Sequence, residues 1–189
     1  RAKVPLSIDA EAEVVMFRAD VGGEEHLAVL VGGEVPAAAP LVRLHSQCMT
    51  GDVLGSLKCD CGDQLKAALS LMAQNGGGVL VYLAQEGRDI GLLNKMRAYA
   101  LQDIGLDTLD ANHALGFQSD ERLFLPASKI LRELGIHEVR LITNNPDKIS
   151  QLDDAGIKVR ERVPLTSTTN THNQRYLDTK RNRSGHFID

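Results

Sequence analysis

The feature that most constrains the fold of this chain is the alternation of strand-like and helix-like segments after residue 60. Residues 79–83 form an unbroken apolar run, typical of a strand buried on both faces, and 139–143 are predicted as a second such strand. Helical spacing of apolar residues predicts helices at 63–75, 92–104, 127–134 and 146–155. This alternation favours an α/β fold.

The first 45 residues differ, because their pattern predicts only strands. Residues 12–18 and 27–31 read as two strands of a hairpin with a Gly22-Gly23 turn, and 41–44 as a short third strand. With a last strand at 157–163, we predict an α/β fold with a layered, mixed β-sheet flanked by helices. We expect residues 1–189 to form a single domain, with a flexible polar tail at 166–189.

Composition narrows the class of protein. Lysine plus arginine number 21 and aspartate plus glutamate 25, which gives a net charge of −4 and argues against a general nucleic-acid binder. No apolar run approaches the length of a membrane span, and the first residues lack the apolar core of a signal peptide. With three cysteines, an odd number, we expect a cytoplasmic protein that binds neither nucleic acid nor membrane.

All three cysteines lie within a window of 14 residues, at Cys48, Cys59 and Cys61. Thiolates suit zinc, and three protein ligands with an open fourth position are typical of a catalytic zinc. His45 could supply a fourth ligand, in which case the zinc would be structural. Three buried thiols without a metal are the remaining interpretation, and the spacing alone leaves these alternatives open.

Polar loops follow the predicted buried strands, where ligands bind in open α/β sheets. In the loop 85–91, Arg88 could hold a phosphate oxygen and Glu86 could accept hydrogen bonds from a base edge. After the next buried strand, Lys148 could add a positive charge for phosphate. The alternative for the loop 85–91 is a solvated turn. An ordinary helix cap explains Asn145 and Pro146, and it leaves Thr143 and Lys148 for function.

A third polar loop spans residues 115–122. Within it, Asp120 could act as a general base and Arg122 could stabilise phosphoryl charge. The alternative is that Ser119 and Asp120 cap a short turn. Tyr99 lies on the apolar stripe of its predicted helix, so its spacing predicts a packing role.

Several long motifs in order resemble the GTP cyclohydrolase II family. They occupy residues 42–62, 85–92, 97–103, 143–146 and 161–165, and the resemblance runs from about residue 12 to 186. It implies an enzyme of the first committed step of riboflavin biosynthesis. In that reaction GTP is hydrolysed to 2,5-diamino-6-ribosylamino-4(3H)-pyrimidinone 5′-phosphate, formate and pyrophosphate, with zinc activating water for attack at C8 of guanine.

The resemblance also implies roles for individual residues. Cys48, Cys59 and Cys61 match the ligands of one zinc ion per chain. Asp120 matches a proton acceptor, Arg122 a residue that acts at the α-phosphate as nucleophile or by its charge, and Tyr99 a tyrosine of the ring-opening step. The positions that match GTP contacts are Arg43, Leu44, His45, Ser46, Gln47, Gln64, Glu86, Gly87, Arg88, Thr108, Thr143 and Lys148.

The resemblance further implies Mg²⁺ with the triphosphate and a homodimer. Three positions depart from the family pattern: Gln47 replaces a glutamate, Ala84 a common arginine and Asp89 a frequent glycine. Two alternatives to the cyclohydrolase interpretation are open. One is a relative that opens the imidazole ring but keeps the formyl group, and the other is a non-catalytic zinc- or nucleotide-binding module.

Overall fold

A seven-stranded mixed sheet forms the framework of the computed structural model, which describes residues 1–19, 23–35, 38–166 and 169–187. The strand order is β1-β2-β3-β5-β4-β6-β7. The strands are β1 (Ala2–Lys3), β2 (Glu13–Arg18), β3 (Glu25–Val31), β4 (Leu41–Ser46), β5 (Gly78–Leu83), β6 (Glu138–Ile142) and β7 (Lys158–Val163).

Both pairing directions occur in this sheet, as the sequence predicts. Strands β2 and β3 form an antiparallel hairpin in which Val15 pairs with Ala28, and β3 is also antiparallel to β5. Strand β6 is parallel to both β4 and β7. Gly22 of the predicted turn lies outside the described residues, whereas Gly23 has φ +67°, a value that glycine adopts without strain.

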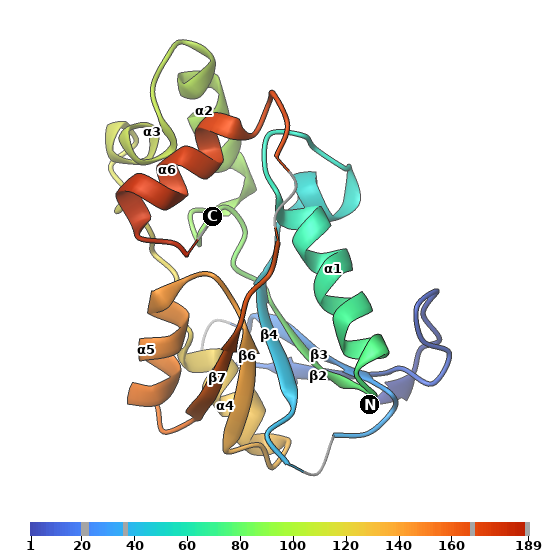
Figure 1. Cartoon of the computed structure of the whole chain (residues 1–189). Coiled ribbons are helices and arrows are strands. Elements are labelled where there is room, and N and C mark those ends of the chain that lie inside the picture. Colours follow the sequence, from blue (N-terminus) through green and yellow to red (C-terminus); the bar gives the residue numbers. More distant parts are fainter. Residues whose placement is uncertain (20–22, 36–37, 167–168, 188–189) are drawn as a thin grey trace. The chain divides into compact units, whose positions relative to one another are not determined.

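The two faces of the sheet carry separate apolar clusters. In β5, Val79, Val81 and Leu83 belong to one cluster and Leu80 to the other, as the two-residue period of a strand requires. Helices α4 (Leu125–Glu133) and α5 (Pro146–Asp154) pack on the first cluster, and α1 (Cys61–Gln74) packs on the second (Figure 1). The continuous apolar strands are thus buried on both sides.

The chain divides into two compact units. The first unit consists of Arg1–His45, Leu65–Ala84 and Leu123–Leu165, and it contains both apolar clusters. The second unit consists of Ser46–Gln64, Gln85–Arg122 and Thr166–Asp189. Its elements are the short π-helical turn η1 (Met49–Val53), the start of α1, and helices α2 (Gly91–Asp103), α3 (Thr108–Ala114) and α6 (Gln174–Ser184).

The structure confirms the predicted helices but differs from the sequence interpretation in three places. The prediction that the apolar stripe of α2 is its buried face is wrong. Leu93 and Ile104 are exposed, and the helix buries Lys95 and Ala98 instead. Helix α3 was not predicted, because its seven residues are too few to show a period. Helix α6 lies in the segment expected to be a flexible tail.

In the part of the chain that the structure describes, no helix is both long and apolar enough to cross a bilayer.

Candidate functional site

The three cysteine sulfurs converge in the second unit. Cys48 precedes η1, and Cys61 is the first residue of α1. The Sγ atoms of Cys48 and Cys59 are 3.7 Å apart, and the sulfurs of Cys48, Cys59 and Cys61 all lie within 4.8 Å of one another. Among the described residues, this group of candidate metal ligands contains no histidine or carboxylate. His45 is therefore not one of the residues whose ligand atoms lie close enough together to share a metal ion with the three sulfurs.

The spacing of the sulfurs fits zinc. Tetrahedral zinc–thiolate bonds of about 2.3 Å place two sulfurs about 3.8 Å apart, close to the separation of Cys48 and Cys59. Gly51 lies against all three cysteines, because a Cβ atom there would be 2.9 Å from Cys59 Sγ and 3.1 Å from Cys48 Sγ. The backbone of η1 thus approaches the sulfurs so closely that only glycine fits.

Lys95 provides a positive charge at the sulfur cluster. Its Nζ donates to Cys48 Sγ at 3.0 Å and to Glu86 Oε1 at 2.9 Å. Hydrogen bonds from the Cys59 and Cys61 thiols, together with Lys95, lower the pKa of Cys48. The hydrogen bond to Cys48 also raises the pKa of Cys59 to about 11. Lys95 and the two neighbouring thiols therefore favour the thiolate form of Cys48.

Glu86 connects the loop after β5 to the cysteine segment. Its Oε2 accepts a hydrogen bond from the backbone N–H of Met49 at 2.6 Å. Its Oε1 accepts from Lys95 and from the backbone N–H of Gly87, at 2.9 Å each. Because both carboxylate oxygens bind groups of the protein, Glu86 has an evident role in positioning η1, beside the nucleotide contact implied by the resemblance.

Asp120 and Arg122 form a two-bond ion pair. Arg122 Nε donates to Asp120 Oδ1 at 2.8 Å, and Nη2 donates to Oδ2 at 2.5 Å. Burial opposes the charged state of Asp120, but the hydrogen bonds and charge of Arg122 outweigh it and lower the pKa of Asp120. The same pair raises the pKa of Arg122 against the effect of burial. Arg122 Nη1 also reaches Ser46 Oγ at 3.4 Å, which connects this pair to the segment before Cys48.

The loop before α2 is held in an uncommon backbone conformation. Arg88 and Asp89 have φ values of +62° and +74°, in the left-handed region that side chains rarely adopt. Arg88 Nη1 donates to the carbonyl of Ser119 at 3.0 Å, and the Arg88 carbonyl accepts from the N–H of Glu121. The loops that carry Arg88 and Asp120 are thereby fastened to each other.

Tyr99 lies close to two lysines and belongs to neither apolar cluster. The Nζ atoms of Lys58 and Lys95 are 5.1 Å and 5.8 Å from the centre of its ring. Burial raises the pKa of Tyr99 to about 12, and Lys95 only partly offsets this effect. The packing role predicted from its helical spacing is therefore wrong, since the apolar stripe faces away from Lys95.

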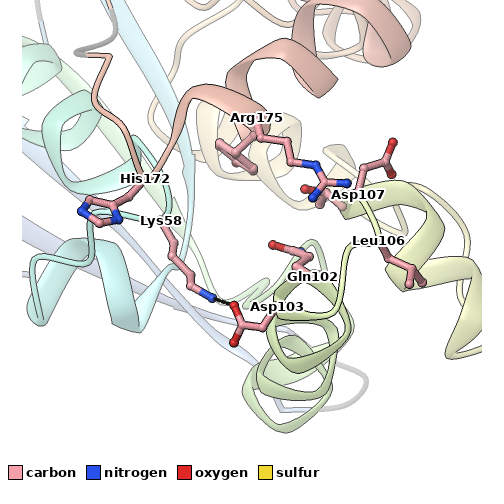
Figure 2. Close-up of a pocket in the computed structure, with 9 residues that line it drawn as sticks. Lys58, Gln102, Asp103, Leu106, Asp107, His172 and Arg175 are labelled. Carbon is pink, nitrogen blue, oxygen red and sulfur yellow. Dashed lines mark hydrogen bonds and ion pairs between the residues drawn. The ribbon is translucent and has the colours of Figure 1, made fainter.

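A pocket in the second unit brings Thr108 together with the C-terminal segment. Thr108 is the first residue of α3, and Asp107 caps the helix by accepting from the N–H groups of Leu109 and Asp110. Figure 2 shows the pocket with an ion pair between Lys58 and Asp103. The lining residues are Lys58, Gln102, Asp103, Leu106, Asp107, Thr108, His172, Arg175 and Tyr176.

Five of the sequence-predicted GTP contacts belong to the first unit. The buried Arg43 donates to the carbonyl of Ile142 at 2.9 Å, and the His45 ring stacks on Tyr82 with 5.4 Å between ring centres. Lys148 is buried, donates to the carbonyl of Leu44 at 2.7 Å and lies 5.1 Å from the centre of the Phe124 ring.

Thr143 is also buried, and its Oγ1 accepts from the N–H of Asn145 at 3.0 Å. Asn145 in turn caps α5 as predicted, since its side chain accepts from the N–H of Asp147. These two contacts fix the turn that leads from β6 into α5.

The remaining predicted contacts lie in the second unit. Ser46 donates to Gln85 Oε1 at 3.3 Å, Gln47 is half-buried, and Gln64 Nε2 donates to Asp60 Oδ2 at 2.6 Å. Gly87 has φ +65°, and a Cβ atom there would lie 3.0 Å from the carbonyl of Gly91. The loop before α2 thus requires glycine at this position.

Sequence reasoning missed four residues around the cysteines, namely Lys95, Asp60, Tyr176 and Lys180. A weak signal existed for Lys95, because it lies four residues before Tyr99 on one helix face. Asp60 is fully buried and pairs with Lys180. Burial and the nearby Cys61 and Asp60 charges raise the pKa of Tyr176 well above its usual value. Nothing local in the sequence marks the residues of α6.

Comparison with known proteins gives consistent similarities. A profile of the GTP cyclohydrolase II family matches residues 1–164. The GTP cyclohydrolase-2 of Azospirillum brasilense is 56% identical over 187 residues, which are 99% of this chain and 49% of that protein. This chain therefore spans about half the length of that relative.

Two further relatives match this chain over most of their own length. The GTP cyclohydrolase-2 of Proteus mirabilis is 53% identical over 99% of this chain and 94% of its own. That of Escherichia coli is 52% identical over 93% of this chain and 90% of its own.

Proposed function

The chain belongs to the GTP cyclohydrolase II family of enzymes, which hydrolyse GTP in riboflavin biosynthesis, and from this premise we propose its full reaction. The proposed products are 2,5-diamino-6-ribosylamino-4(3H)-pyrimidinone 5′-phosphate, formate and pyrophosphate. The observation that carries this proposal is the three-cysteine cluster, which lies in the same compact unit as the Asp120–Arg122 pair.

Cys48, Cys59 and Cys61 would hold one zinc ion. Bound there, zinc supplies the Lewis acidity that makes water nucleophilic near neutral pH. The sulfur spacing and the room left by Gly51 support this assignment. Lys95 would offset part of the negative charge of three thiolates and orient Cys48 through its hydrogen bond.

Arg122 would act on the α-phosphate by its charge. Its pKa is raised because Asp120 binds two of its nitrogens, so the guanidinium stays protonated. A protonated guanidinium is a poor nucleophile but a good partner for phosphoryl oxygens. Asp120 is ionised because its pKa is lowered, which leaves it able to accept a proton or a hydrogen bond.

Tyr99 would serve the ring-opening step as a hydrogen-bond donor. With a pKa of about 12, its hydroxyl keeps its proton near neutral pH. Its position near the ammonium groups of Lys58 and Lys95 supports a place beside the cysteine cluster.

The twelve residues that match GTP contacts are proposed to bind the nucleotide, with Mg²⁺ on the triphosphate. Arg43 and Lys148 are buried cations of the first unit, and Arg88 is a cation of the second. We propose Arg88 as a phosphate ligand, because the N–H of Glu121 holds its backbone carbonyl and the carbonyl of Ser119 orients its guanidinium through Nη1. Glu86 accepts hydrogen bonds from Lys95, Gly87 and Met49, so we propose that it positions these groups in addition to contacting the nucleotide.

A product assay tests the proposal. The zinc-loaded chain is incubated with GTP and Mg²⁺, and formate and pyrophosphate are measured together. Release of both in equal amounts is expected, and Cys59→Ser should abolish it along with zinc retention. Pyrophosphate without formate would identify a ring-opening relative that keeps the formyl group. Absence of both products, from a chain that retains zinc, would contradict the enzyme proposal.

We also propose a homodimer. In the second unit Val53, Leu54 and Leu93 are large apolar side chains that are mostly exposed, and burial against a second copy would remove them from water. Sedimentation equilibrium should give twice the chain mass of 20.5 kDa, and a single chain mass at micromolar concentration would contradict this assembly.

A further inference from the structure

Asp60 is a fully buried carboxylate between two of the candidate zinc ligands. Its Oδ1 accepts from Lys180 Nζ at 2.7 Å, and its Oδ2 accepts from Gln64 Nε2 at 2.6 Å. The carbonyl of Asp60 also accepts the backbone N–H of Gln64 at 3.0 Å. A buried carboxylate is costly unless it is paired, so the conformation around Cys59 and Cys61 depends on these partners.

Lys180 is the cationic partner, and it comes from α6, 120 residues further along the chain. Its side chain is 10% exposed, and its Nζ lies 4.4 Å from the centre of the Tyr176 ring, one turn earlier on the helix. Removing this ammonium group would leave Asp60 buried without its counter-charge.

Helix α6 has further contacts within the second unit. Arg183 pairs with Asp107, the N-cap residue of α3, and with Asp110 in α3, and Arg175 donates to the carbonyl of Gly105. Tyr176 and Arg175 line the same pocket as Thr108. The α6 residues that make these contacts lie beyond residue 164, where the match to the family profile ends.

We propose that Lys180 is a positioning residue of the active site, which fixes Asp60 and thereby Cys59, Cys61 and Gln64. Helix α6 is then part of the apparatus that retains the metal and binds the nucleotide. This inference rests on the proposed function for the roles of the cysteines and Gln64. Its central claim, that a lysine of α6 controls the metal ligands, is measurable without turnover.

The test compares the rate of zinc release from the wild-type protein with that from the Lys180→Met variant. Release into a chromogenic chelator is followed over time, and the KM for GTP is measured beside it. Loss of a partner behind metal ligands weakens metal binding by about 10- to 100-fold, so release should accelerate by about tenfold or more. The KM should rise as well, because Gln64 loses its fixed acceptor.

Two further variants separate this role from general folding. Asp60→Asn combined with Lys180→Met removes both charges, so zinc release should be slower than from Lys180→Met alone. It also keeps the test open if the single variant does not fold. Arg183→Met removes the two ion pairs of Arg183 with Asp107 and Asp110 from the same helix and should leave the release rate within about twofold of the wild type.

The outcomes that test the role of Lys180 differ from the outcome that tests the proposed zinc enzyme. A folded Lys180→Met that releases zinc at the wild-type rate would overturn the inference, as would equal acceleration in Arg183→Met. A double variant no slower than the single one would also contradict it. A wild-type chain that retains no zinc would count against the proposed function instead.

Discussion

At the scale of single residues, Gly51 has no room for a side chain, because the cysteines lie against it. A methyl group there would meet Cys59 Sγ at 2.9 Å and Cys61 Cβ at 3.0 Å. Gly51→Ala must therefore displace a metal ligand, and we expect zinc affinity to fall by about tenfold or more. Competition with a chelator of known affinity measures the change.

Gly55→Ala is the matched control for this substitution. Gly55 follows in the same segment with φ +66° and nothing within 4 Å of its Cβ position. Alanine there should cost about 1 kcal/mol of stability through backbone strain but leave zinc affinity unchanged. Equal zinc affinity in the two variants would contradict the close approach of Gly51 to the sulfurs.

The Asp120–Arg122 pair predicts a pH dependence of stability. The folded-state pKa of Asp120 is lowered, so its contribution is complete above the ordinary aspartate pKa of about 3.9 and is lost as the pH falls through the lowered value. Asp120→Asn should lower the free energy of unfolding at pH 7 by about 1–2 kcal/mol.

Urea titrations at several pH values measure this difference. It should shrink below about pH 4, where Asp120 of the unfolded chain takes up its proton, and disappear once the pH has fallen through the lowered pKa of the folded state. The exposed Asp154→Asn is the control and should show little difference at either pH. A loss in Asp120→Asn that is the same at pH 7 and in acid would exclude an ionic contribution.

At the scale of elements, α5 begins with a helix cap that the sequence predicts, between the predicted site residues Thr143 and Lys148. Asn145 is the N-cap residue, and its side chain accepts from the N–H of Asp147 at 2.9 Å. Asn145→Ala should cost about 1 kcal/mol of unfolding free energy, whereas the exposed Ser150→Ala on the same helix should cost less than about 0.5 kcal/mol. Chemical denaturation distinguishes them, and equal losses would argue against the cap.

Helices α2 and α6 show where local rules stop. The period of α2 predicts a helix, and the structure confirms one, but its apolar stripe is exposed. The buried face is set by the bonds of Lys95 with Cys48 and Glu86. In α6, Leu177, Thr179 and Lys180 are buried although the segment is strongly polar, because Lys180 has a carboxylate to bind.

At the scale of the whole molecule, the two units differ in what stabilises them. Both apolar clusters of the described residues lie in the first unit, whereas the cysteine cluster lies in the second. Zinc bound to the folded state adds stability by mass action, about 4 kcal/mol at a concentration 1,000 times its dissociation constant. Removing zinc should therefore loosen the second unit first.

Amide hydrogen exchange measures this expectation. After chelation, exchange should accelerate in η1, in the first turn of α1 and in α2, while β3 and β5 keep their protection. Returning zinc should restore the original pattern. Uniform acceleration in both units, or no change in either, would contradict a metal contribution confined to the second unit.

The type and order of most elements, the mixed sheet and the cysteine cluster could all be predicted from the sequence. These follow from short-range patterns: apolar runs in β5 and β6, helical spacing in α1, a cap at Asn145 and three thiols within 14 residues. The groups that surround the sulfurs, in contrast, are brought together by long-range contacts of the folded chain. Asp60 and Lys180 are 120 residues apart, and no periodicity relates a buried charge to a partner at that separation. The physical reason is that a buried carboxylate requires some counter-charge, but only the fold determines which lysine reaches it.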